Sequence, residues 1–78
     1  MKLNIPSVIK IMKEVIGDRF NKENQRMITS ELKAIKKEHD NNHTRVTIHD
    51  YWRRSIACYT PYEYLTKLRN KLFETFNK

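Results

Sequence analysis

The near absence of chain-breaking residues is the feature that most constrains how this chain folds. Its 78 residues include one glycine, Gly17, and two prolines, Pro6 and Pro61. Glycine and proline mark turns and loops, so a chain with so few of them favours helices joined by short connections. The composition, 38% hydrophobic and 32% charged, suits a folded domain. We therefore predict a single all-α domain over residues 1–78, a compact bundle of about four short helices.

Apolar residues at helical spacing predict the first two helices. The first helix runs from about Pro6 to Ile16, because proline suits a first helical turn and Gly17 suits a helix end. The second runs from about Lys22 to Glu38, with Asn21 as a candidate cap. The apolar stripes that define these helices are Ile5, Val8, Ile9, Met12, Val15 and Ile16 in the first, and Met27, Ile28, Leu32 and Ile35 in the second.

A capping box predicts the start of a third helix at Thr47. The Thr47 hydroxyl can accept from the backbone of Asp50, whose carboxylate can accept in return. On this helix Trp52 shares a face with Ile48 and Ile56, so we expect it in the core. The arginines that follow Trp52 fall off that face and are expected to point outward. Residues 44–48 alternate in a strand-like way, which leaves a short β segment open before the helix.

The stretch from Thr60 to Glu63 resembles the start of a fourth helix. Thr60 is the expected cap, Pro61 the first helical residue, and Glu63 the third residue after the cap. The helix runs to about Phe76. Its apolar side is formed by Leu65, Leu68, Leu72, Phe73 and Phe76.

The net charge of +7, from 16 basic and nine acidic side chains, raises the expectation of a polyanionic partner. The charge is not concentrated along the chain. Residues 1–39 carry nine basic and five acidic side chains, and residues 40–78 carry seven and four. An ordinary solvent-exposed set of charges therefore stays open as an alternative explanation.

The stretches MITSELKAIKKE and TIHDYWRRSIA resemble, in outline, the paired helices of small bacterial and phage helix-turn-helix domains. The resemblance implies that the second stretch enters the major groove of double-stranded DNA while lysines of the first contact phosphates. The connection of about eight residues departs from the usual three or four. Asp50 faces the same way, but could instead pair with Arg54 within the helix. The predicted nucleic-acid-binding residues are Lys33, Lys36, Lys37, Arg45, Thr47, His49, Arg53 and Arg54.

The segment HDNNH raises the question of a metal site. His39 and His43 are four residues apart, and His49 or Asp50 could supply a third ligand for zinc. Adjacent asparagines favour turns and disfavour the continuous helix that this spacing needs. A polar loop is therefore the preferred interpretation, with no metal and no cofactor.

Catalysis has little support in this sequence. Cys58 is the only cysteine, which excludes an internal disulfide, and we expect it to be a small buried or half-buried side chain. A thiol nucleophile would need a base beside it, and His49 lies nine residues earlier, about 13 Å along a helix. We therefore predict a protein that is not an enzyme.

Two functions remain as hypotheses. The first is a small cytoplasmic regulator that binds DNA through the helix-turn-helix-like pair. The second is a small phage-type regulator or inhibitor that binds a larger host or phage protein. No apolar run approaches the roughly 18 residues of a membrane span, and the sequence leaves a homodimer open. Salt dependence separates the two hypotheses, because phosphate contacts weaken steeply as salt rises.

Overall fold

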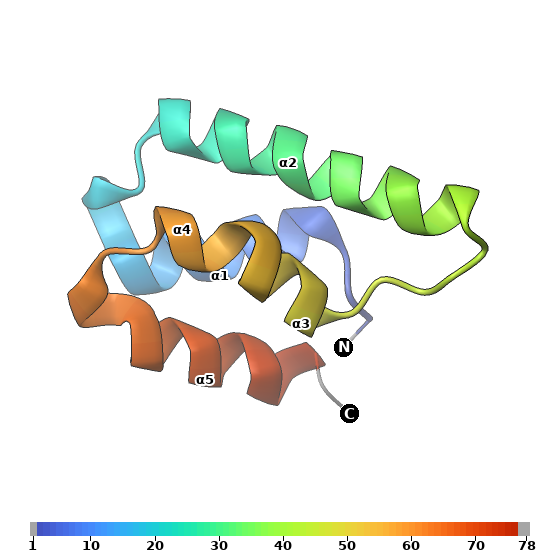
Figure 1. Ribbon diagram of the computed structural model, residues 1–78. Coiled ribbons are helices and arrows are strands. Elements are labelled where there is room, and N and C mark those ends of the chain that lie inside the picture. The colour runs from blue at the N-terminus through green and yellow to red at the C-terminus, as the bar shows by residue number, and fades with distance from the viewer. Residues whose placement is uncertain (1, 77–78) are drawn as a thin grey trace.

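The computed structural model describes residues 2–76 (Figure 1). The N-terminal half of the chain forms two helices. Helix α1 spans Ile5–Ile16 and is followed by a single 3₁₀ turn, η1, at Gly17–Arg19. Helix α2 spans Lys22–Asn41 and is the longest element. Both helices confirm the sequence prediction, with small changes at their ends.

The C-terminal half contains one interrupted helix and a final helix. The interrupted helix consists of α3 (Ile48–Tyr51), a π-helical turn η2 (Trp52–Ile56) and α4 (Ala57–Tyr59), and we call it the α3–α4 rod. A 3₁₀ turn η3 (Tyr62–Tyr64) then leads into α5 (Leu65–Phe76). Within the described residues there is no β-strand, so the short β segment left open near 44–48 does not form.

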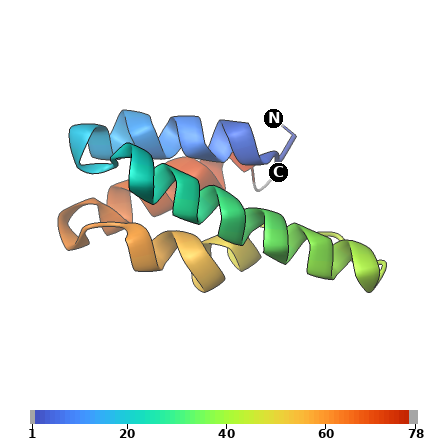
Figure 2. The same cartoon turned by 90° about the horizontal axis from the view of Figure 1, so that it is seen from above.

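Successive segments run in alternating directions, as in an up-down-up-down bundle. Figures 1 and 2 show α2 on one side of the molecule, α5 on the opposite side, and α1 and the α3–α4 rod between them. Both α2 and α5 contact α1 and the rod. The pair formed by α2 and the rod is an antiparallel hairpin (Figure 2). It therefore differs from a helix-turn-helix, whose helices cross at about 90–120°.

Two asparagines cap the first two helices. Asn4 accepts a hydrogen bond from the Ser7 backbone at 2.9 Å, so α1 begins at Ile5, one residue before the predicted start. Asn21 accepts from the Asn24 backbone at 2.8 Å, as predicted for α2. Gly17 ends α1 as predicted, with a φ of 76° that glycine adopts at little cost.

Helix α2 ends three residues later than predicted, in a Schellman motif. His43 has a φ of 56°. The Thr44 N–H donates to the His39 carbonyl at 2.9 Å, and the His43 N–H donates to the Asp40 carbonyl at 3.2 Å. These are the two bonds of the motif, with a histidine at the left-handed position that glycine usually occupies. The turn that the adjacent asparagines favour therefore comes only after residues 39–41 have extended α2 by nearly one helical turn.

The capping box at Thr47 is confirmed, whereas the predicted cap at Thr60 is wrong. The Thr47 N–H donates to the Asp50 carboxylate at 3.3 Å, and the Asp50 N–H donates to the Thr47 hydroxyl at 3.4 Å. The Thr60 hydroxyl donates backward to the Ile56 carbonyl at 2.7 Å. Pro61 has a ψ of 144°, which is not helical, so α5 starts only after η3. A residue before proline avoids helical geometry, which makes Thr60 the end of the rod.

The core lies between all four segments and contains most of the predicted apolar positions. Met27 is an exception, because it is 46% exposed and so does not belong to the stripe of α2. Trp52 is half-buried and packs against the core, a partial confirmation. The buried apolar side chains are Val8, Ile11, Met12, Ile16, Phe20, Ile28, Leu32, Ile35, Ile48, Tyr51, Ile56, Leu68 and Leu72.

Candidate nucleic-acid interface

Arg53 and Arg54 point outward as predicted, but each lies beside a carboxylate. Their side chains are 77% and 40% exposed. Arg54 donates to Glu38 of α2 at 2.8 Å, and this hydrogen bond lowers the pKa of Glu38. Arg53 lies 3.5 Å from Asp50, so the ion pair within the α3–α4 rod forms at i, i+3 and not with Arg54. Both guanidinium groups are therefore partly neutralised within the fold.

Asp50 joins the start of α3 to the end of α2. Its carboxylate lies 3.3 Å from His39 Nε2, while His39 Nδ1 lies 2.7 Å from the Thr44 hydroxyl. Burial alone would raise the pKa of Asp50. The hydrogen bonds from Thr47 and the nearby charges of His39 and Arg53 outweigh burial, and the pKa lies below its ordinary value. These contacts give His39 and Asp50 a structural role at the corner.

Of the proposed metal ligands, His39 and Asp50 contact each other, but no third ligand joins them among the described residues. In the part of the chain that the structure describes, no three His, Cys, Asp or Glu side chains are grouped so that they could hold a metal ion. His43 occupies the left-handed turn after α2 and is exposed. His49 is exposed on α3, and its ring packs on Phe73 of α5 with 4.4 Å between ring centroids. The histidines thus lie in three separate settings.

Of the remaining predicted residues, Lys36, Arg45 and Thr47 lie together, because all three line one pocket. Arg45 and Thr47 belong to the connection before α3, where Arg45 is exposed and Thr47 is engaged in its capping box. Lys33, Lys36 and Lys37 are exposed on α2. The structure therefore brings Lys36, Arg45 and Thr47 together but not the whole predicted set, since His49, Arg53 and Arg54 contact Phe73, Asp50 and Glu38 respectively.

The solvent side of α2 carries a line of cations that we call the α2 cationic stripe: Lys22, Arg26, Lys33 and Lys37. All four are exposed. At about 100° per residue they fall within roughly 60° of arc, opposite the buried Ile28, Leu32 and Ile35. Within residues 2–76 none of the four forms an ion pair, whereas neighbouring Lys36 pairs with Asp40 at 3.1 Å.

Two of the four acidic residues of α2, Glu31 and Glu38, contact the α3–α4 rod, whereas Glu23 and Asp40 are exposed. Glu31 accepts from Ser55 at 2.9 Å and from the Tyr59 hydroxyl, and this second bond raises the pKa of Tyr59. Glu38 accepts from Arg54, as described above. Glu31 and Glu38 are thus held by partners on the rod and do not neutralise the four cations of the stripe.

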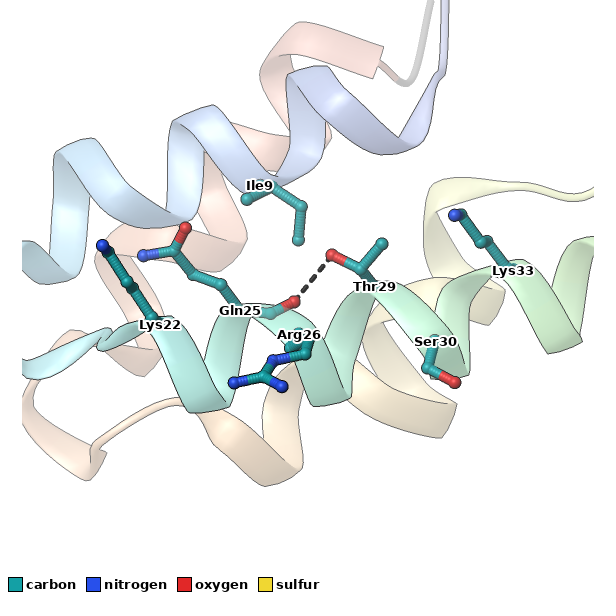
Figure 3. A pocket seen from close by; sticks show the side chains of 7 residues that line it. All are labelled: Ile9, Lys22, Gln25, Arg26, Thr29, Ser30 and Lys33. Atoms are coloured by element: carbon teal, nitrogen blue, oxygen red, sulfur yellow. Dashed lines mark hydrogen bonds between the residues drawn. The ribbon is translucent and has the colours of Figure 1, made fainter.

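An open groove of about 500 Å³ borders the stripe where α2 meets α1 (Figure 3). Lys22, Gln25 and Thr29 extend from α2 toward Ile9 of α1, and Arg26 lies on the adjoining face. The Thr29 hydroxyl donates to the Gln25 carbonyl at 2.6 Å, and the Gln25 amide donates to the Phe20 carbonyl at 2.9 Å. Polar groups beside the stripe are therefore held in place by the backbone.

Sequence reasoning included Lys33 and Lys37 but missed Lys22 and Arg26 as members of one surface. Their spacing of i, i+4, i+11 and i+15 was a usable signal, because such positions share one helix face. The expectation for Cys58 was wrong, since its side chain is exposed. It lies two residues after buried Ile56, which places it on the opposite side of the rod.

Comparison with known proteins adds no assignment: the sequence matches no protein-family model, and no curated protein or solved structure matches the chain. Within residues 2–76, no helix combines the length and apolar character needed to cross a membrane.

Proposed function

We propose that this chain is a non-enzymatic DNA-binding protein that holds the phosphate backbone of double-stranded DNA along the α2 cationic stripe. The observation that carries the proposal is the alignment of four cations on one exposed helix face without carboxylate partners among the described residues. Such cations displace the counterions that surround DNA, which favours binding.

The length of the stripe suits a polyanion. From Lys22 to Lys37 it extends about 22 Å, at about 1.5 Å per helical residue. Double-stranded DNA carries about one charge per 1.7 Å of its axis, so several phosphates lie within that length. Polar side chains such as Gln25 and Ser30 border the stripe and add potential donors to phosphate oxygens.

The proposal differs from the helix-turn-helix hypothesis in whether the protein recognises the base sequence of the DNA. Arg53 and Arg54 would have to give up Asp50 and Glu38 before pairing with a guanine edge. The cations of α2 need no such exchange. Because phosphate contacts carry no sequence information, we expect binding that depends little on base sequence.

The experiment is a fluorescence-anisotropy titration with several duplexes of unrelated sequence. The double variant Arg26→Ala with Lys33→Ala should bind all of them more weakly, and by the same factor. The matched control is Lys67→Ala with Lys71→Ala, which removes two exposed cations from α5 on the far side of the bundle. Equal weakening by both pairs would show that net charge, and not the stripe, drives binding.

A further inference from the structure

A second groove lies between the N-terminal part of α1 and the side of α2 that carries Thr29, Lys33 and Lys36. We call it the N-terminal groove. Its volume is about 750 Å³, and it adjoins the groove beside the stripe, because Ile9, Thr29 and Lys33 line both. The apolar side chains that line it are Leu3, Ile5, Pro6, Ile9, Val46 and Tyr51.

The floor of this groove is apolar and fixed. Tyr51 is buried beneath it, while Leu3, Ile9 and Val46 pack against the core and keep part of their surface in water. Apolar side chains left exposed around a hollow are characteristic of interaction sites. Because the same side chains support the core, the groove exists without a partner.

The edge of the groove is cationic. Lys2, Lys33 and Lys36 line it, and no acidic side chain does so among the residues described. Lys36 pairs with Asp40 on its other side, but both groups are more than half exposed, and such pairs are weak. An occupant that matches this surface needs apolar groups for the floor and negative charges for the edge.

We infer that the N-terminal groove binds an amphipathic segment of a partner protein, with apolar side chains in the groove and carboxylates against the lysines. The groove is open along one side, whereas small-molecule sites enclose most of their ligand. An open apolar groove matches the way short helical segments dock, through apolar anchors at i, i+3, i+4 and i+7. This inference does not rest on DNA binding.

The test begins with selection from a library of random peptides displayed against the full 78-residue chain. The expected result is enrichment of peptides that combine helical apolar spacing with acidic flanks. Leu3→Asp should weaken the strongest peptide by about tenfold or more, since it places charge at an anchor position. Met27→Asp is the matched control, because it makes the same type of change at an exposed site of α2 outside the groove.

Charge complementarity is tested by exchange. Lys2→Glu with Lys36→Glu should weaken the selected peptide, and a peptide whose acidic residues are replaced by lysine should regain affinity for that variant. These variants leave the α2 cationic stripe intact. Their duplex affinity is measured in parallel, so failure of the groove and failure of the proposed DNA binding are distinguishable.

Chemical shifts of the wild-type protein provide a readout that no folding defect can affect. Addition of the selected peptide should shift the resonances of Leu3, Ile9 and Val46. Shifts confined to other faces would overturn the inference. So would a library that yields no enriched peptide, or one that yields acidic peptides without apolar spacing.

Discussion

Tyr51 and Trp52 are adjacent in sequence but differ in how much the fold depends on them. Tyr51 is 1% exposed, whereas Trp52 is half-buried and meets Phe73 edge-on at 6.3 Å between centroids. Truncation of a buried aromatic removes its transfer energy and leaves a cavity, so Tyr51→Ala should cost about 3–5 kcal/mol. Trp52→Ala should cost less. Urea unfolding of both variants tests the order, and the reverse order would place Trp52 at the centre of the core.

Asp50 makes the stability of the fold sensitive to acid. Its pKa is lowered in the folded state, so the unfolded chain takes up a proton first and stability rises with pH in that range. The contribution is present above the ordinary aspartate pKa of about 3.9 and is lost as pH falls toward the lower folded value. Asp50→Asn should therefore unfold with a flatter pH dependence below about pH 4. If the free energy of unfolding depended on pH in the same way for the variant and the wild type, Asp50 would not be a source of the acid sensitivity.

Individual core positions could be predicted where a regular helix carries them. Ile28, Leu32 and Ile35 follow the helical period and are buried as expected. Tyr51 was missed because the π turn that follows it winds through fewer degrees per residue than an α-helix, and this changes which side chains face inward. Phe20 was missed because it lies in a turn, where no period applies.

At the scale of the helices, His43 carries a strain that substitution should relieve. A left-handed conformation costs an ordinary residue about 1–2 kcal/mol. Glycine adopts this conformation without that cost, although it loses more backbone entropy on folding. His43→Gly should therefore raise the free energy of unfolding by up to about 1 kcal/mol. Asn42→Gly is the control, since Asn42 has a φ of −96° and gains nothing from glycine. Thermal melts that rank Asn42→Gly above His43→Gly would contradict the Schellman assignment.

Helix boundaries were predictable where a side chain and the backbone agree. Asn21 and the Thr47–Asp50 box both form because their polar side chains have backbone donors within reach. Position 60 is also a threonine and precedes a proline, but the Thr60 hydroxyl donates to the carbonyl of Ile56, four residues earlier. A sequence pattern shows that a threonine can cap, and only the packed chain shows which helix end it satisfies.

The distribution of charge belongs to the whole molecule and was invisible along the chain. Basic residues are spread evenly over the two halves of the sequence. In the bundle, Glu31 and Glu38 turn toward the α3–α4 rod while the α2 cationic stripe stays in water. The all-α bundle followed from helical periodicity, but this asymmetry followed from which faces of α2 the neighbouring helices cover.

The salt dependence of duplex binding tests the proposed interface most directly. If the four cations of the stripe neutralise about four phosphates, log K plotted against log salt should have a slope of about −3 to −4. Arg26→Ala with Lys33→Ala should reduce that slope by about 2, whereas Lys67→Ala with Lys71→Ala should leave it unchanged. The proposed interface would be contradicted if the wild-type protein bound no duplex at low salt. It would also be contradicted if Arg26→Ala with Lys33→Ala left the slope unchanged.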